Sequence, residues 1–368
     1  MNIGLCGFGV VGRGVYEIVR QRPDMKVKKI LCLEDIQLPD AQTVKDFSEI
    51  LNDPEIDTVV EAMGGLHPSY DFARAALEAG KNVVSSNKAM VCTFYDELIP
   101  LAMHKGVSLR CTAAVGGGIG WLSELERARR VQTINQVGGI MNGTCNYILD
   151  NMTRLGLGYD EALKQAQKLG YAEANPATDV DGIDTWHKVI LSANVAFGIS
   201  LDKTTVPVSG IRNISAADVD CFKAHGKVCK LISTAKRTED GFSAYVQPTL
   251  VAAGSPEGAV PLNYNLITFI GQTSERMSFY GQGAGRYPTA YNVVQDLVDV
   301  TQGKSFYAPY GAPQAADNQE AHRYYVRGDW EGSIQEDWST GVITAPVPVS
   351  QMHQWVKDHP DAFIAAID

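Results

Sequence analysis

A glycine-rich segment near the N-terminus constrains the fold of this chain most strongly. Residues 7–12 read GFGVVG, and they stand between the apolar run Asn2–Cys6 and apolar residues at helical spacing. A strand, a glycine turn and a helix in this order form the fingerprint of a dinucleotide-binding unit. Gly7 permits a tight turn, Gly9 lets the backbone approach a pyrophosphate, and Gly12 allows close packing of helix and strand. The segment therefore predicts a dinucleotide site at the N-terminus of a helix.

The residues after this fingerprint predict alternating strands and helices. We expect strands at 27–33, 56–63, 82–88 and 107–115 and helices at 44–51 and 70–79. Such alternation predicts a Rossmann-type, doubly wound parallel sheet, which binds its ligand at the carboxyl ends of the strands. Met63, Gly64 and Lys88 fall at that edge. For Lys88, an ordinary surface position is the alternative.

Glu34 follows the second expected strand. An acid about 20 residues beyond the glycines can accept both ribose hydroxyls of NAD, whereas an arginine there favours the 2′-phosphate of NADP. Position 33 is leucine, which favours NAD, although Lys28 and Lys29 lie close by in sequence. The alternative is that Glu34 is a solvated loop residue.

Several carboxylates and one lysine gather in the segment 170–188, GYAEANPATDVDGIDTWHK. Buried carboxylates are costly unless they bind a cationic or polar partner. If the chain is helical from Ile183 onward, Asp184 and Lys188 form an i,i+4 pair on one helix face. The alternative is a solvated acidic loop followed by a surface ion pair.

The length of 368 residues predicts two domains. Further expected elements are strands at 134–140, 230–236 and 243–251 and helices at 159–169, 183–195 and 290–299. They predict an α+β domain with a mixed sheet. We expect a dinucleotide-binding domain at 1–130, completed by the helix at 286–302, and a substrate-binding and dimerisation domain at 131–285. Residues 303–368 then form a C-terminal tail.

Composition excludes several classes of partner. The net charge of −10 disfavours nucleic acid and anionic membranes. The seven cysteines lack the spacing of zinc sites and are typical of reduced thiols. The sequence shows no signal-peptide pattern and no run of about 18 apolar residues that could span a membrane. We therefore expect a cytoplasmic protein that binds small molecules.

Residues 1–302 resemble the homoserine dehydrogenase family. Seven segments in the same order carry the resemblance: GFGVVG, VVEAMGG, KNVVSSNKA, AVGGGI, GGIMNGTCNYIL, GYAEANPATDVDGIDTWHK and GQGAGRYPTA. The resemblance implies an NAD(P)-dependent oxidoreductase that interconverts L-homoserine and L-aspartate 4-semialdehyde, in the biosynthesis of threonine, methionine and isoleucine. It also implies a homodimer.

The resemblance further implies roles for single residues. Lys188 would be the general acid/base that exchanges a proton with the substrate oxygen, and Lys88 would polarise that oxygen. Glu173 and Asp184 would bind the ammonium and hydroxyl ends of the substrate, with support from Asp179. Two lysines suit this reaction because hydride transfer to an aldehyde builds negative charge on its oxygen. The cofactor would be lined by Phe8, Val10, Val11, Met63, Gly64, Gly170 and Gly283.

The chain departs from the family pattern near an ion site. Members usually carry Glu where this chain has Thr112, and that Glu helps to bind a sodium ion together with main-chain carbonyls. The matching carbonyls belong to Val115, Gly117 and Ile119. Threonine is a neutral, monodentate ligand, so neither ion dependence nor the choice between NAD and NADP need follow the family.

Two other functions remain open at this point. Family members usually carry Pro where this chain has Gly120, and the departures at Thr112 and Gly120 leave room for a dehydrogenase of a related amino-acid alcohol or aldehyde. A non-catalytic nucleotide-binding sensor is disfavoured because it has no use for both Lys88 and Lys188.

The tail resembles part of a small regulatory ACT domain at residues 321–327. Such a domain needs about 70–80 residues, and 48 remain from residue 321 onward. We therefore expect a truncated ACT-like remnant. The prolines of VITAPVP, residues 342–348, exclude a central strand and predict an edge strand or an extended arm.

Overall fold

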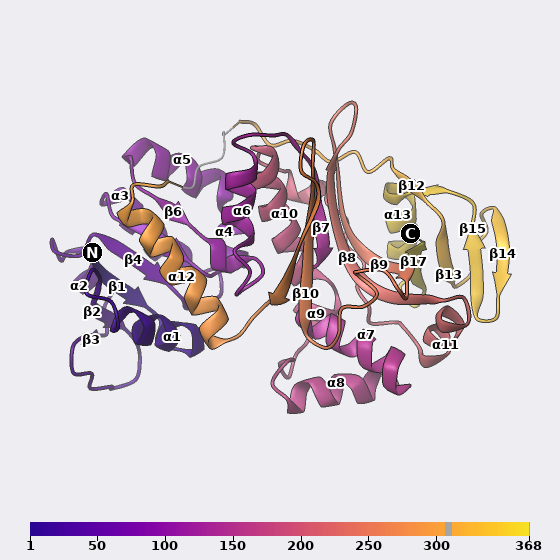
Figure 1. Ribbon diagram of the computed structural model, residues 1–368, viewed down its shortest axis with the longest axis horizontal. Helices are drawn as coiled ribbons and strands as arrows, with labels where there is room; N and C mark the ends of the chain where they lie inside the picture. Colours follow the sequence, from indigo (N-terminus) through magenta and orange to yellow (C-terminus); the bar gives the residue numbers. More distant parts are fainter. Residues whose placement is uncertain (306–310, 368) are drawn as a thin grey trace. The chain divides into compact units, whose positions relative to one another are not determined.

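The computed structural model describes residues 1–305 and 311–367 (Figure 1). The chain divides into two compact units. The first unit comprises Met1–Val131, Asn194–Ser200 and Gln282–Ala312, and the second comprises Gln132–Ala193, Leu201–Gly281 and Pro313–Asp368. Among the described residues, no helix is both long and apolar enough to cross a membrane.

The first unit is built on a six-stranded sheet in the order β3-β2-β1-β4-β5-β6. The strands are β1 (Asn2–Cys6), β2 (Lys26–Leu31), β3 (Gln42–Val44), β4 (Thr58–Glu61), β5 (Asn82–Ser85) and β6 (Leu109–Arg110). All five pairings are parallel. The order changes direction between β1 and β4, which is where a doubly wound sheet binds its ligand. The predicted Rossmann-type sheet is confirmed.

The helices of the first unit include one from the far end of the sequence. They are α1 (Val10–Val19), α2 (Ser48–Leu51), α3 (Ser69–Glu78), α4 (Lys88–Thr93), α5 (Tyr95–Lys105), α6 (Trp121–Ala128) and α12 (Arg286–Thr301), with the short 3-10 helix η1 (Thr112–Ala114). Helix α12 packs beside α1 (Figure 1). Gly14 permits this contact, since a Cβ atom there would lie 2.9 Å from the Cβ of Ala290. Val15 and Leu297 share the core between the two helices.

Several elements of the first unit are shorter than expected. The strands expected at 56–63 and 82–88 are only Thr58–Glu61 and Asn82–Ser85, and Lys88 begins α4 instead. Only Ser48–Leu51 of the segment 44–51 is helical, because Gln42–Val44 extends the sheet beside β2. The strand expected at 107–115 ends after Arg110. Its ladder stops there because the backbone N–H of Thr112 donates to the Asp296 carboxylate at 2.7 Å.

The second unit contains a nine-stranded sheet in the order β11-β10-β7-β8-β9-β17-β13-β15-β14. The strands are β7 (Ile134–Ile140), β8 (Lys227–Arg237), β9 (Phe242–Ala252), β10 (Tyr264–Gly271), β11 (Glu275–Gln282), β13 (Tyr324–Arg327), β14 (Ile334–Trp338), β15 (Gly341–Thr344) and β17 (Phe363–Ile367). Strand β17 is parallel to β9, whereas β7 is antiparallel to both β8 and β10. The predicted mixed sheet is confirmed.

The helices of the second unit include a short one that was not expected. They are α7 (Gly143–Leu155), α8 (Tyr159–Lys168), α9 (Ala177–Val180), α10 (Ile183–Phe197), α11 (Ala216–Ala224) and α13 (Val349–Asp358), with the 3-10 helix η2 (Lys203–Thr205). Helix α9 lies inside the carboxylate-rich segment. The Pro176 carbonyl accepts the N–H groups of Asp179 and Val180, so Asp179 sits on a helical turn.

The prediction of an edge strand or extended arm at 342–348 is wrong for residues 342–344 and is confirmed for Val347–Pro348. Strand β15 lies between β13 and β14 and is therefore internal. Its residues, Gly341–Thr344, end before the first proline, Pro346. Pro348 belongs to β16 (Val347–Pro348), which pairs with β12 (Ala321–His322) in a separate two-stranded sheet.

A buried histidine of α13 predicts acid sensitivity. His353 is 3% exposed, and its ring nitrogens lie 3.1 Å from Ser209 Oγ and 3.1 Å from Gln247 Oε1. Burial lowers the pKa of His353 from 6.5 to about 3. Between these two values the unfolded chain binds the proton and the folded chain does not. Stability from this residue is thus present above the unfolded pKa and is lost as the pH falls towards the folded pKa.

Replacing His353 with glutamine is expected to remove this acid-dependent loss, which amounts to about 1.4 kcal/mol per pH unit inside the window. Urea denaturation at neutral pH and at stepped lower pH values measures the slope. The matched control is His104→Gln, because His104 is exposed and should not alter it. An unchanged slope in His353→Gln would show that other groups cause the acid sensitivity.

Candidate functional site

The glycine turn between β1 and α1 has the geometry that a dinucleotide fingerprint requires. Gly7 has φ +96°, a left-handed conformation that favours glycine. A Cβ atom on Gly12 would lie 2.1 Å from the Gly7 carbonyl oxygen, so only glycine fits. A Cβ atom on Gly9 would meet no atom within 4 Å, so the space beside it is open to a phosphate. The first N–H groups of α1 have no partner within the helix and suit a bound phosphate.

A buried carboxylate that sequence analysis missed shapes the adjacent edge of the sheet. Glu61 is 0% exposed and accepts the backbone N–H groups of Met63 at 2.9 Å and Gly64 at 3.3 Å. It also accepts the Ser85 hydroxyl at 2.6 Å. The Ser85 oxygen in turn accepts the backbone N–H of Asn87 at 3.0 Å. The available signal was an acid at the end of the apolar strand TVVE, since such a residue is buried only with partners.

Lys88 is the first residue of α4 and is half-buried. The preceding Asn87 caps this helix, because its side chain accepts the N–H of Met90 at 3.1 Å. The Asn87 amide also donates to the Gly65 carbonyl at 2.7 Å. These bonds fix the backbone at the carboxyl end of β5, so Lys88 lies at the edge where sequence analysis expected it.

Glu34 lies after β2, exposed, with a partner that was not anticipated. Its carboxylate forms a 3.0 Å ion pair with Arg13 of α1. Position 33, where an arginine would favour NADP, is a leucine that is 94% exposed. The signal for Arg13 was its place directly after the fingerprint, one turn into α1. An acid and a cation are therefore adjacent after β2.

The other residues expected to line the cofactor lie in both units. In the first unit, Phe8 is buried, Val10 is exposed and Val11 is half-buried at the start of α1. Gly283 lies against another glycine loop, since a Cβ atom on Gly117 would be 2.6 Å from the Gly283 carbonyl. Gly170 belongs to the second unit, where it follows α8 with φ +76°.

Two of the three carbonyls expected to bind a sodium ion accept hydrogen bonds within the chain. The Gly117 carbonyl accepts the side-chain N–H of Asn292 at 2.6 Å. The Ile119 carbonyl accepts the backbone N–H of Trp121 at 2.7 Å. Val115 lies between η1 and this loop. A carbonyl oxygen has a second lone pair that one hydrogen bond leaves available, so the sodium site stays a prediction.

Thr112 belongs to a buried ion-pair network. Its hydroxyl donates to Asp296 at 2.7 Å and lies 2.8 Å from Ser123 Oγ. Arg110, which is 0% exposed, pairs with Asp296 at 3.0 Å and with Asp299 at 2.8 Å. A fixed guanidinium thus supplies positive charge here. Within 1–305 and 311–367, no three His, Cys, Asp or Glu side chains gather as a metal site.

In the second unit, the carboxylate-rich segment converges on one buried lysine. Lys188 Nζ lies 2.7 Å from Asp184 Oδ2, one turn earlier on α10. The same ammonium group donates to the main-chain carbonyl of Met141 at 2.7 Å. Lys188 is 7% exposed and Asp184 is 4% exposed. The predicted i,i+4 pair is confirmed, and the alternative of a solvated surface pair is wrong.

Asn142, which sequence analysis did not single out, joins the carboxylates of this cluster. Its Nδ2 atom donates to Asp179 at 2.7 Å and to Asp184 at 2.8 Å. Its Oδ1 atom accepts the N–H of Cys145 at 2.8 Å and so caps α7. Burial, followed by the neighbouring Asp184, raises the pKa of Asp179. The available signal was an asparagine directly before the segment 143–149, GTCNYIL, since asparagine is a preferred N-cap residue.

Glu173 lies outside this cluster in the described structure. It is exposed between α8 and α9, and its backbone carbonyl accepts a hydrogen bond from Gln167 at 3.1 Å. The structure therefore brings together Asp179, Asp184 and Lys188, but not Glu173. Lys88 belongs to the first unit and Lys188 to the second.

The arrangement in the second unit suits proton transfer and the binding of a cation. A buried ammonium group held by a carboxylate can give a proton to a nearby oxygen. Two carboxyl groups face a single lysine, so the cluster has spare negative charge for a cationic ligand group.

Comparisons with known proteins identify relatives of the chain. A family model described as homoserine dehydrogenase matches residues 121–298, and one described as its NAD binding domain matches residues 7–112. Homoserine dehydrogenase of Bacillus subtilis is 34% identical over 330 residues, which cover 84% of this chain and 76% of the relative. That of Corynebacterium glutamicum is 34% identical over 361 residues, which cover 91% of this chain and 81% of the relative.

The fold is also that of a solved structure. The crystal structure of a homoserine dehydrogenase from Thiobacillus denitrificans superposes with a TM-score of 0.89 at 27% identity. The match covers 100% of this chain and 98% of that chain.

Proposed function

Because the chain belongs to the homoserine dehydrogenase family, we propose that Lys188 is the residue that exchanges a proton with the substrate oxygen. The chain is an NAD(P)-dependent oxidoreductase that interconverts L-homoserine and L-aspartate 4-semialdehyde. The observation that carries the role of Lys188 is its burial with its ammonium group 2.7 Å from Asp184. We assign cofactor binding to the first unit and substrate binding to the second.

The proton and hydride steps follow from these groups. The bound nicotinamide supplies or accepts a hydride at the carbon that carries the oxygen. During aldehyde reduction, Lys188 donates a proton to the oxygen as the C=O electron pair moves onto it, and the lysine becomes a neutral amine. During alcohol oxidation the amine takes the hydroxyl proton, and the O–H electron pair forms the C=O bond. Lys88 stabilises the negative charge that develops on this oxygen.

The carboxylates bind the other end of the substrate in this proposal. Asp179 and Asp184 provide the charge that the substrate ammonium needs, and Glu173 adds a third acid from the exposed segment after α8. Asp184 also orients Lys188. The test of this set is the Lys188 replacement described in the Discussion.

We propose that NAD is the preferred cofactor. Glu34 can accept both ribose hydroxyls, and its charge opposes the 2′-phosphate of NADP. Glu34 also forms an ion pair with Arg13 of α1. Replacing Glu34 with glutamine is therefore expected to shift the ratio of kcat/KM values towards NADP by about tenfold, which corresponds to about 1.4 kcal/mol.

The matched control for this change is Asp35→Asn. Asp35 is the next residue and pairs with Lys45 at 2.8 Å. Its loss should leave the cofactor ratio near the wild-type value. A wild type that already prefers NADP, or a ratio insensitive to Glu34→Gln, contradicts the proposal.

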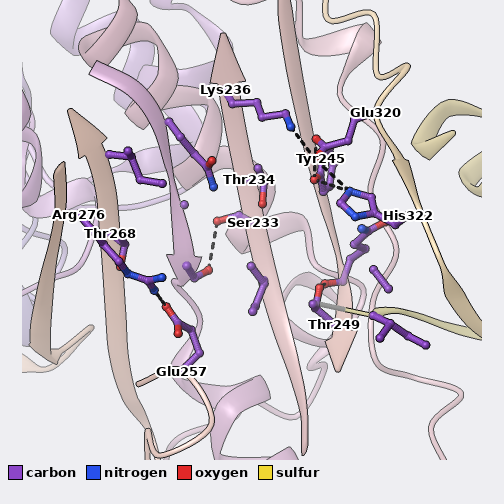
Figure 2. A pocket seen from close by; sticks show the side chains of 18 residues that line it. Ser233, Thr234, Lys236, Tyr245, Thr249, Glu257, Thr268, Arg276, Glu320 and His322 are labelled. Atoms are coloured by element: carbon purple, nitrogen blue, oxygen red, sulfur yellow. Dashed lines mark hydrogen bonds and ion pairs between the residues drawn. The ribbon is translucent and has the colours of Figure 1, made fainter. Parts of the chain in front are cut away.

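We propose that a second copy of the chain covers an open face of the mixed sheet. On β8, Leu231 and Ser233 are buried, whereas the alternate residues Ile232 and Thr234 are only half-buried. Residues of this half-buried face line a cavity of about 360 Å³ (Figure 2). A face that exposes both aliphatic and hydrogen-bonding side chains suits a self-complementary interface.

Replacing Thr234 with arginine is expected to weaken the dimer, because the new charge would be desolvated in the interface. Light scattering after gel filtration should give twice the 39.9 kDa chain mass for the wild type and a lower mass for the variant. The control is Gln335→Arg on β14, where the side chain is exposed at the far edge of the sheet. A monomeric wild type would exclude the homodimer.

We also propose that the protein works in the cytoplasm. All seven cysteines are free thiols, and six of them are buried. This pattern is typical of proteins in a reducing compartment. Fractionation of cells that contain the protein would test this, and recovery outside the cytoplasmic fraction would contradict it.

A further inference from the structure

We propose that Asn142 is a positioning residue for the reaction: its amide group sets the separation of Asp179 and Asp184 and thereby fixes the place of Lys188. The inference rests on the proposed function of the Lys188 cluster. It concerns a residue that neither transfers the proton nor carries a charge.

The orientation of the Asn142 side chain follows from its hydrogen bonds. Asn142 is 3% exposed and stands at the N-cap of α7. Its Oδ1 atom is needed by the N–H of Cys145, which is a donor, so Nδ2 must face the two carboxyl groups. The two N–H bonds of Nδ2 go to Asp179 on α9 and to Asp184 on α10. One amide therefore ties three helices together at the site.

Asn142 and Lys188 share one acceptor atom. Asp184 Oδ2 accepts Asn142 Nδ2 at 2.8 Å and Lys188 Nζ at 2.7 Å. The position of this oxygen thus depends on both donors. If the amide donor is lost, the carboxylate is free to turn and the lysine ammonium turns with it. Displacement of a proton donor by a fraction of an ångström lowers its efficiency.

The Asn142 amide also lies between the carboxyl groups of Asp179 and Asp184 in a buried cluster. Asp184 and Lys188 of α10 face Asp179, while α7 contributes only the neutral Thr144 and the Cys145 thiol. Asp181, at the end of α9, is paired with Arg212 at 2.8 Å. Burial and Asp184 raise the pKa of Asp179, and the hydrogen bond from Asn142 opposes this rise. Removal of the amide donor should therefore raise it further.

The test removes the amide donor of Asn142 and keeps a side-chain oxygen that can cap α7. Asn142→Asp retains the side-chain volume and an oxygen for the Cys145 N–H, but it places an acceptor against Asp179 and Asp184. Asn142→Ser retains a cap oxygen and a single hydroxyl donor. The measurement is the pH dependence of kcat and of kcat/KM for the reduction of L-aspartate 4-semialdehyde, because Lys188 acts there as the ammonium form and the acid limb then reports the carboxyl groups.

We expect the acid limb of the kcat/KM profile to move to higher pH by about one unit or more in Asn142→Asp. The sign follows because the Asp179 carboxyl group, with its pKa raised further, stays protonated to higher pH and cannot bind the substrate ammonium. The shift in Asn142→Ser should be smaller, because one donor remains. KM should rise with the loss of cation binding, and kcat should fall with the displacement of Lys188.

The matched control is Ser215→Ala at the N-cap of α11. Ser215 accepts the N–H of Asp218 at 3.1 Å and makes no bond to the cluster. Loss of this cap should lower Tm and leave the pH profile unchanged. A folded Asn142→Asp that lowers Tm and keeps the wild-type profile would show that Asn142 is only a helix cap. If Asn142→Asp does not fold, the profile of Asn142→Ser decides in the same way.

Lys188→Ala separates this inference from the proposed function. If Lys188→Ala loses activity while both Asn142 variants keep the wild-type profile, only the role of Asn142 is wrong. If Lys188→Ala keeps wild-type activity, the proposed site itself is wrong.

Discussion

Replacement of Lys188 with alanine is expected to lower kcat/KM for L-homoserine by about 10²-fold or more, because the reaction then lacks its general acid/base. The loss should appear in both directions, since the same nitrogen gives and takes the proton. The cofactor affinity should stay near the wild-type value, because the residues of the fingerprint belong to the other unit. Initial rates and a separate titration with reduced cofactor measure the two quantities.

The stability of the Lys188→Ala variant must be measured beside its activity. Removal of one partner from a buried ion pair can cost about 3–5 kcal/mol. Asp184 keeps the hydrogen bond from Asn142, which lessens the cost. Lys164→Ala, at an exposed position of α8, is the control for loss of a lysine charge. A folded Lys188→Ala with undiminished kcat/KM would contradict the assigned role.

Gly9→Ala is expected to weaken cofactor binding, whereas Gly12→Ala is expected to destabilise the fold. Gly9 has extended dihedral angles and open space around its Cβ position, so the alanine variant should fold with little change in stability. Its methyl group would occupy the place of the pyrophosphate, and we expect the cofactor Kd to rise by about tenfold or more. Gly12→Ala would place a methyl group 2.1 Å from the Gly7 carbonyl oxygen and should destabilise the fold by about 1–3 kcal/mol.

Thermal unfolding and fluorescence titration with reduced cofactor distinguish these two effects. We expect Gly9→Ala to keep the wild-type Tm and to bind the cofactor weakly, whereas Gly12→Ala should have a lowered Tm. Unchanged cofactor binding by Gly9→Ala would show that the phosphates bind elsewhere. Each variant serves as the control for the other, because both add one methyl group to the same turn.

Local patterns sufficed to predict most of the first sheet. Strands β1, β4 and β5 contain short apolar runs, and the fingerprint fixes the first turn, whereas β3, with the sequence QTV, has no such run and was not predicted. The packing of α12 on α1 brings residue 290 against residue 14, and no local pattern records such a contact. The same holds for the tail, where Ala366 pairs with Thr249 and extends the mixed sheet. Pairing across such distances depends on the folded chain.

In the candidate site, too, contacts between residues close in sequence were predictable, whereas contacts between distant residues were not. Asp184 and Lys188 were predictable because four residues along a helix place them on one face. Asn142 was not, because its partners lie 37 and 42 residues further along the chain. The hydrogen bonds of the loop 115–119 could not be predicted from the sequence for the same reason. The Thr112 departure was visible in the sequence, whereas the hydrogen bond from Asn292 to Gly117 spans 175 residues.

The most direct test of the central claim is the initial rate of L-homoserine oxidation by the wild-type protein with NAD and with NADP. We expect reduced cofactor to form at a rate that saturates with L-homoserine. We expect none to form with L-2-aminobutyrate, which lacks the hydroxyl group. The contradicting result is a protein that binds the cofactor but leaves L-homoserine unoxidised with both forms. Turnover of a different amino-acid alcohol under the same conditions would then identify the true substrate.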